Sequence, residues 1–175
     1  MSASVRLDTA RVTEVLARLA AGAKNPAPLY KAIGEELITS TRARFATSTA
    51  PDVSRWAPNS RVTFEAYLSR FAGTARKDGR LNAKCSGVVM GKKPLVGESR
   101  QLATQIYYNL TPRGLEIGSP MEYAAMQQFG GSKAEFPHLW GDIPARPFLG
   151  LSAQDEDAIE AEALAYLGDL LGNAG

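Results

Sequence analysis

Apolar residues recur at helical spacing in four segments of the chain, and they alternate in only one block. Helical spacing runs through residues 8–21, 28–47, 60–72 and 153–171. Alternation runs through 102–110 and 115–119, on either side of the turn-like sequence TPRG. Because the strands form one block and do not alternate with helices, the pattern predicts an α+β fold. We expect N-terminal helices packed on a small antiparallel sheet with an inserted short helix, and then a C-terminal helix.

The second helical segment has the clearest apolar face. Its i, i+4 ladder consists of Leu29, Ile33, Leu37, Thr41 and Phe45. The charged residues Glu35, Glu36, Arg42 and Arg44 fall mostly off that stripe. This helix is therefore expected to bury its ladder, and it shows no sign of catalytic chemistry.

The length of 175 residues predicts a single domain spanning 1–175. Residues 73–97 are rich in Gly and Lys, and we expect a basic loop, insertion or small hairpin there. No apolar run approaches the roughly 20 residues that span a bilayer, so no membrane partner is expected. The lone Cys85 excludes an intrachain disulfide and fits a reducing compartment such as a cytoplasm.

The formal net charge of +2 hides an uneven distribution. Residues 61–100 carry nine basic and three acidic side chains, whereas residues 151–175 carry six acidic and no basic ones. This asymmetry indicates contact with nucleic acid, an acidic partner, or two parts of the protein that meet within or between subunits.

The stretch IGSPMEYAAMQQFGG, residues 117–131, carries dense local signals for the inserted helix. Ser119 is a candidate N-cap, Pro120 suits the first helical position, and Glu122 falls at the third, which together form a capping box. Gly130 can end the helix in the left-handed conformation. The stretch is therefore expected to turn the chain from strand to helix and to stop the helix sharply.

The stretch IPARPFLGLS, residues 143–152, is predicted to be an edge strand, because its two prolines cannot donate to a ladder. Phe148 is expected in the core, since large aromatic residues on short strands usually point inward. Arg146 has three open interpretations: a charge-assisted bond to Glu122, one to a backbone carbonyl, or an exposed side chain without a fixed partner.

The sequence offers no catalytic residue, metal site or cofactor motif. His138 is the only histidine and has no nucleophile motif beside it, and one histidine with one cysteine cannot hold zinc. The GVVMGKK stretch, 87–93, lacks the spacing and the final Ser or Thr of a phosphate-binding loop. The acids of 155–157 lack calcium-loop spacing. With Ser152, Asp155 instead repeats the capping-box signal at the last helix.

Two long stretches carry a family resemblance. VGESRQLATQIYYNLTPRGLEIGSPMEYAAMQQFGG, followed by IPARPFLGLSAQDEDAI, resembles the phage virion morphogenesis family, which includes tail-completion proteins of Mu-like and P2-like phages and prophages. The matching pieces are residues 102–106, 117–124, 128–131 and 144–150. The residues that the motif marks as fold-defining are Ser119, Glu122, Tyr123, Gly130, Gly131, Arg146, Pro147 and Phe148.

The resemblance implies a structural, non-enzymatic component of the head–tail neck or upper tail. Such proteins work as rings, often six-fold, around the DNA passage. The implied partners are further copies of the chain and adjacent neck or tail proteins. The implied location is the head–tail junction of the virion, after assembly in the host cytoplasm. The motifs leave open whether the role is that of a stopper, a tail terminator or a tail-completion factor.

The charge asymmetry suggests a contact between neighbouring subunits of such a ring. The residues of this hypothetical interface are Lys84, Lys92 and Lys93 on one subunit and Asp155, Glu156 and Asp157 on the next. A competing hypothesis places Arg76, Lys77 and Arg80 in the channel, in contact with packaged DNA. The alternative function is a non-enzymatic nucleic-acid-binding accessory protein that uses residues 61–100.

Overall fold

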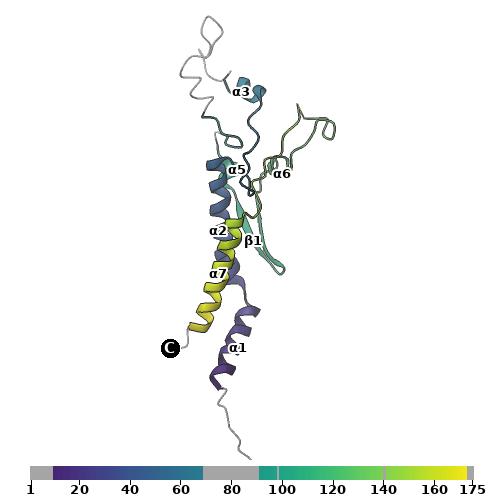
Figure 1. Cartoon of the computed structure of the whole chain (residues 1–175). Helices are drawn as coiled ribbons and strands as arrows, with labels where there is room; N and C mark the ends of the chain where they lie inside the picture. Colours follow the sequence, from purple (N-terminus) through teal and green to yellow (C-terminus); the bar gives the residue numbers. More distant parts are fainter. Residues whose placement is uncertain (1–9, 69–90, 98, 140, 173–175) are drawn as a thin grey trace, which may run out of the picture.

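The computed structural model describes residues 10–68, 91–97, 99–139 and 141–172, and they form the expected mixed α+β fold. The order of elements is α1 (Ala10–Lys24), α2 (Ala27–Thr47), α3 (Arg61–Leu68), α5 (Gln101–Thr104), β1 (Tyr107–Thr111), β2 (Gly114–Gly118), α6 (Ala124–Phe129) and α7 (Ala153–Gly172). The molecule is elongated, with α2 and α7 side by side, α1 at one end, and α3, α5 and α6 toward the other (Figure 1).

Helix α2 is the central element, and its sequence explains its limits and its buried face. Proline occupies its first turn, where a missing N–H is harmless, and Ser48 ends it in the left-handed conformation with φ of 58°. Ile33, Leu37, Thr41 and Phe45 of the predicted ladder are all buried. Helix α2 contacts α7 and both strands of the hairpin.

The hairpin has the predicted antiparallel pairing but starts later than predicted. Tyr107 pairs with Gly118, and the register continues without interruption to the turn. The predicted strand over 102–106 is wrong, because α5 and a short connection occupy that segment. The reason is that Leu102 and Ile106 are buried whereas Thr104 between them is exposed, although a strand would turn all three side chains to the same face.

The predicted capping box at the inserted helix is also wrong. Helix α6 begins at Ala124, and an irregular segment that ends in a turn at residues 122–123 precedes it. The Ser119 hydroxyl accepts a hydrogen bond from the Met121 N–H at 3.4 Å instead of capping a helix. Because the turn brings Met121 and Ala124 against the core, burial decides where this helix starts.

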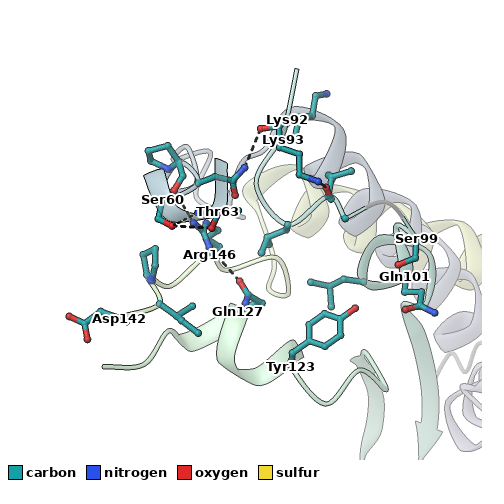
Figure 2. Close-up of a pocket in the computed structure, with 18 residues that line it drawn as sticks. Ser60, Thr63, Lys92, Lys93, Ser99, Gln101, Tyr123, Gln127, Asp142 and Arg146 are labelled. Atoms are coloured by element: carbon teal, nitrogen blue, oxygen red, sulfur yellow. Dashed lines mark hydrogen bonds between the residues drawn. The ribbon is translucent and has the colours of Figure 1, made fainter. Parts of the chain in front are cut away.

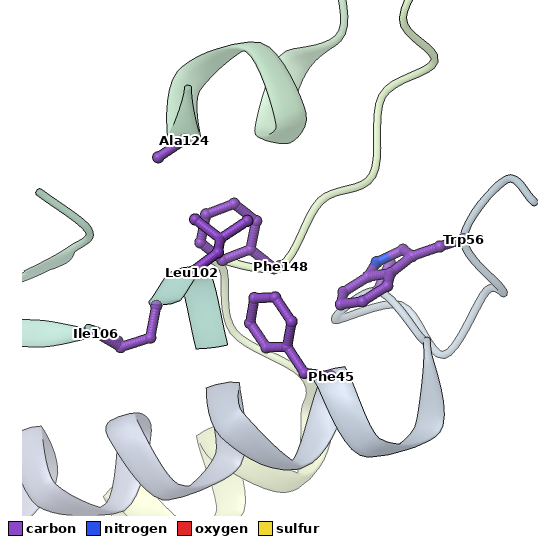
Figure 3. Packing of buried hydrophobic residues seen from close by; sticks show 7 residues of the cluster. Phe45, Trp56, Leu102, Ile106, Ala124 and Phe148 are labelled. Carbon is purple, nitrogen blue, oxygen red and sulfur yellow. The ribbon is translucent and has the colours of Figure 1, made fainter. Parts of the chain in front are cut away.

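The main core lies where the second helix, the α5 turn and the segment before α7 meet. Phe148 is fully buried there, with Phe45 packed against it at a centroid distance of 5.5 Å (Figure 3). Trp56 meets Phe45 edge-on at 5.2 Å. Ala50, Leu102, Ile106 and Ala124 complete the cluster, which confirms the prediction that Phe148 is a core residue.

Gly34 marks the close approach of α2 to the hairpin. A Cβ atom added there would lie 2.6 Å from Cγ of the Tyr108 ring. We expect Gly34→Ala to lower the free energy of unfolding by about 1 kcal/mol, because an overpacking penalty of about 1–3 kcal/mol exceeds the gain in helix propensity. Gly168→Ala on α7 is the matched control: open space surrounds that position, so helix propensity should stabilise it by up to about 1 kcal/mol. Urea unfolding of both variants checks the opposite signs, and a stabilised Gly34→Ala would contradict the tight contact.

Candidate assembly site

Residues 143–150, here called the central strap, do not form the predicted edge strand. Ile143 makes one antiparallel bridge with Gly131, and no ladder follows. Pro144 and Pro147 supply no N–H, so the strap is held mainly by side chains that reach its backbone from other segments. The prediction that the prolines prevent a central strand was right, but the strand itself is absent.

Two polar side chains replace a neighbouring strand. The Gln128 amide oxygen accepts hydrogen bonds from the N–H groups of Phe148 and Leu149, at 2.9 and 3.0 Å, and its nitrogen donates to the Leu149 carbonyl at 2.9 Å. Trp56 Nε1 donates to the Pro147 carbonyl at 2.7 Å. The QFGG motif and the tryptophan loop therefore fix the strap from two sides.

Arg146 binds backbone carbonyls, which was one of the three open interpretations. Its side chain is buried, with Nε donating to the Ala57 carbonyl at 2.8 Å and Nη2 to the Pro58 carbonyl at 2.9 Å. Nη1 reaches the Gln127 amide oxygen at 3.4 Å (Figure 2). Burial lowers the pKa of Arg146 from its ordinary value. Glu122 is not among these hydrogen-bond partners, so Arg146 ties the strap to the 57–58 loop.

Arg44 and Asp155 form a buried ion pair between α2 and the start of α7. Both side chains are nearly inaccessible, at 7% and 3% exposure. Arg44 Nη1 also donates to the carbonyls of Phe148 and Gly150, at 3.0 and 2.8 Å. The guanidinium therefore joins the second helix, the strap and the last helix at one point.

The second predicted capping box is confirmed and is part of this cluster. The Asp155 carboxylate accepts from the Ser152 N–H at 2.7 Å, and the Ser152 hydroxyl accepts from the Asp155 N–H at 3.2 Å. Burial raises the pKa of Asp155, but hydrogen bonds with Ser152 and Ser40 and the charge of Arg44 outweigh it, so this pKa is lowered. The charge of Asp155 is therefore paired with Arg44 within the subunit, whereas Glu156 and Asp157 are exposed.

Gly130 ends α6 with positive φ, but not in the left-handed helical conformation that was predicted. Its φ of 74° is combined with ψ of −177°. A Cβ atom there would lie 2.7 Å from the Ala145 nitrogen and 2.8 Å from the Ile143 carbonyl oxygen. At Gly131, the same atom would lie 2.5 Å from the Met126 sulfur. The two glycines allow the strap to cross the end of the helix at close range.

The basic candidate residues and His138 do not form one site in the described part of the chain. Lys92 Nζ donates to the Val96 carbonyl at 2.9 Å, and Lys93 Nζ donates to the Ala46 carbonyl. The other predicted basic residues, Lys84, Arg76, Lys77 and Arg80, lie outside the described residues, as do 69–90 as a whole. His138 is exposed, with its ring edge-on to Phe136.

A cavity of about 430 Å³ lies beside the strap, between the 58–63 segment and the 92–102 segment. Figure 2 shows Lys92 and Lys93 at one rim, Tyr123 at the opposite rim and Arg146 between them. Within the described parts of the chain, no group of His, Cys, Asp or Glu has the arrangement of a metal site. The cavity has a mixed polar and apolar lining, and its arginine is already bound to backbone carbonyls.

The strap and the Gln128 side chain that binds it coincide with the motifs PARPFLG and QFGG. The model of the phage virion morphogenesis family matches residues 7–168. The chain belongs to this family. Phage virion morphogenesis proteins are structural and generally not enzymes, which fits a site built of packing and backbone contacts. Comparisons with curated proteins and with solved structures gave no significant match. No described helix has the length and hydropathy needed to cross a membrane.

Sequence reasoning missed three residues that hold this site together: Arg44, Trp56 as a hydrogen-bond donor, and Gln128. Gln128 was visible only as a polar residue within the QFGG motif. Arg44 had one available signal, since it directly precedes Phe45 of the buried ladder, but its partner is 111 positions away in the chain.

Proposed function

We propose that this protein is a ring component of the head–tail neck or upper tail of the virion, required to join the tail to the DNA-filled head. The family match over residues 7–168 carries this proposal. The finer role, as stopper, tail terminator or tail-completion factor, depends on which particle the protein joins.

Exposed apolar side chains support an assembling protein. On α7, Leu164, Leu167 and Leu171 are exposed and follow one another at i, i+3 and i+7, so they share one stripe of the helix. This stripe adjoins the face through which α7 packs on α1, where Leu170 contacts Gly22. Phe129, at the opposite part of the molecule, is 77% exposed. A contiguous apolar stripe such as that on α7 is typical of protein–protein contacts, whereas a single exposed residue such as Phe129 is not diagnostic.

The proposed charge contact between neighbouring subunits involves fewer residues than the sequence alone suggested. Glu156 and Asp157 are exposed at the start of α7 and are free to face a neighbour, whereas Asp155 is buried. The basic partner surface would include Lys92 and Lys93, which line the cavity beside the strap. Contact of Arg76, Lys77 and Arg80 with DNA in the lumen stays a hypothesis of the same proposal.

The second candidate function is a nucleic-acid-binding accessory protein. The observation that favours it is the excess of nine basic over three acidic residues in 61–100. Basic segments bind phosphates with an affinity that falls steeply with salt concentration. The two functions therefore differ in what the free protein binds.

Light scattering of the purified protein, alone and mixed with tails or DNA-filled heads of the phage, tests the proposal. We expect a ring-sized species, or a monomer that joins one of the two particles in several copies; the particle that it joins identifies its side of the neck. A monomer that ignores both particles but binds duplex DNA in a salt-dependent manner would favour the accessory function instead. The His138→Ala variant is a suitable matched control, because that exposed ring should not affect either result.

A further inference from the structure

The hairpin leaves two open sheet edges. In the described part of the chain, β1 and β2 pair only with each other. Along the outer side of each strand, alternate N–H and C=O groups therefore have no ladder partner. Helix α2 packs against both strands, so it covers a face of the hairpin and not an edge.

Among the described residues, nothing gives these edges the usual protection against pairing with another chain. Natural edge strands are blunted by lysines, prolines, bulges or a covering element. Here, five consecutive residue pairs run from Tyr107–Gly118 to Thr111–Gly114 without a bulge. Within the two strands, Glu116 is the only charged residue, and there is no proline. Strands of this kind are suited to extending a sheet.

We propose that β1 of one copy pairs with β2 of the next copy, which makes the hairpins one continuous antiparallel sheet. This inference rests on the proposed ring and names the contact that joins its subunits. Because β1 and β2 run in opposite directions, placing β1 beside the next copy's β2 preserves the alternation of strand direction around the ring. The two strands have the same length of five residues, so neither edge is left overhanging.

We assign these edges to a second copy of the chain, because a contact that repeats from copy to copy leaves no strand edge unpaired. A β1–β1 contact between two copies would leave both β2 edges open. A β1–β2 contact repeats at each subunit and closes when the ring closes, which is how barrels eliminate edges. The face turned away from α2 then carries Tyr107, Asn109 and Glu116, all exposed in the subunit.

Cross-linking of two single-cysteine variants tests the sheet. Asn109 and Glu116 are the central residues of their strands and lie directly opposite each other on one exposed face. Asn109→Cys and Glu116→Cys are made separately in a Cys85→Ser background, one with an affinity tag, and are mixed before binding to tails or heads. Oxidation to a disulfide joins directly opposed cysteines, whose Cβ atoms lie about 4.5–5.5 Å apart, but not cysteines two strands away, at about 10 Å.

The expected result is a tagged–untagged covalent dimer in the mixed particle-bound sample, with no dimer when either variant is used alone. Hydrogen exchange of peptides covering 107–118 should also slow on particle binding, since previously free amides enter the ladder. Particle binding without this cross-link and without slower exchange would overturn the sheet but leave the proposed function standing. A dimer of Asn109→Cys alone would indicate a β1–β1 contact and would overturn it as well. A chain that joins neither particle overturns the proposed function itself.

Discussion

Phe148→Ala is expected to lower the free energy of unfolding by about 3–5 kcal/mol, the range for truncating a buried aromatic residue. The side chain is fully buried and contacts Phe45 in the centre of the cluster. Its backbone also binds Gln128 and Arg44, so the strap cannot easily collapse into the cavity that the substitution leaves. Incomplete relaxation places the effect toward the upper part of that range.

Phe129→Ala is the matched control, because it deletes the same atoms from a side chain that is 77% exposed. This variant should change the stability of the free protein by no more than about 0.5 kcal/mol. Urea unfolding followed by circular dichroism gives both values. Similar effects at the two positions would show that Phe148 does not occupy the centre of the core.

Arg44→Ala is expected to destabilise the free protein by about 3–5 kcal/mol, as is usual when one partner of a buried ion pair is removed. The substitution leaves the Asp155 carboxylate buried beside no cation and deprives the Phe148 and Gly150 carbonyls of their donor. Arg42→Ala is the control, since that arginine is exposed and makes one bond, to the Thr104 carbonyl at 3.0 Å. It should cost no more than about 0.5 kcal/mol. Equal losses in the two variants would argue against the buried pair.

Because the pKa of Asp155 is lowered in the folded protein, the stability of the fold should depend on pH in the acid range. A carboxyl group with a folded-state pKa below its unfolded value contributes stability above the unfolded pKa, near 3.9. That contribution is lost as pH falls from this value through the lower folded pKa. The wild-type protein should therefore lose stability in this acid range, and Asp155→Asn should lose less of it while being less stable at pH 7. An unchanged acid profile in Asp155→Asn would contradict the assignment.

Local patterns predicted much of the secondary structure. The i, i+4 ladder of α2, the TPRG turn and the Ser152–Asp155 capping box are confirmed, because each depends on residues within a few positions of one another. The errors occurred where packing overrides such signals. Leu102 and Ile106 are buried while Thr104 between them is exposed, so the short helix α5 replaces the first part of the predicted strand. The Ser119 signal belongs to a turn that buries Met121, and not to a helix start.

The sequence by itself determined the helices at both ends, the hairpin and the family, since periodicity, turn composition and ordered motifs are all legible along the chain. Only the tertiary structure decided that Arg44 is buried, that Asp155 is its partner and not a free interface charge, and that the strap is clamped by side chains instead of a ladder. The physical reason is distance along the chain. A charged side chain is buried only where an opposite charge and hydrogen-bond partners compensate its loss of solvation. The charged partner of Arg44 lies 111 residues away in the chain, so local sequence patterns do not reveal it.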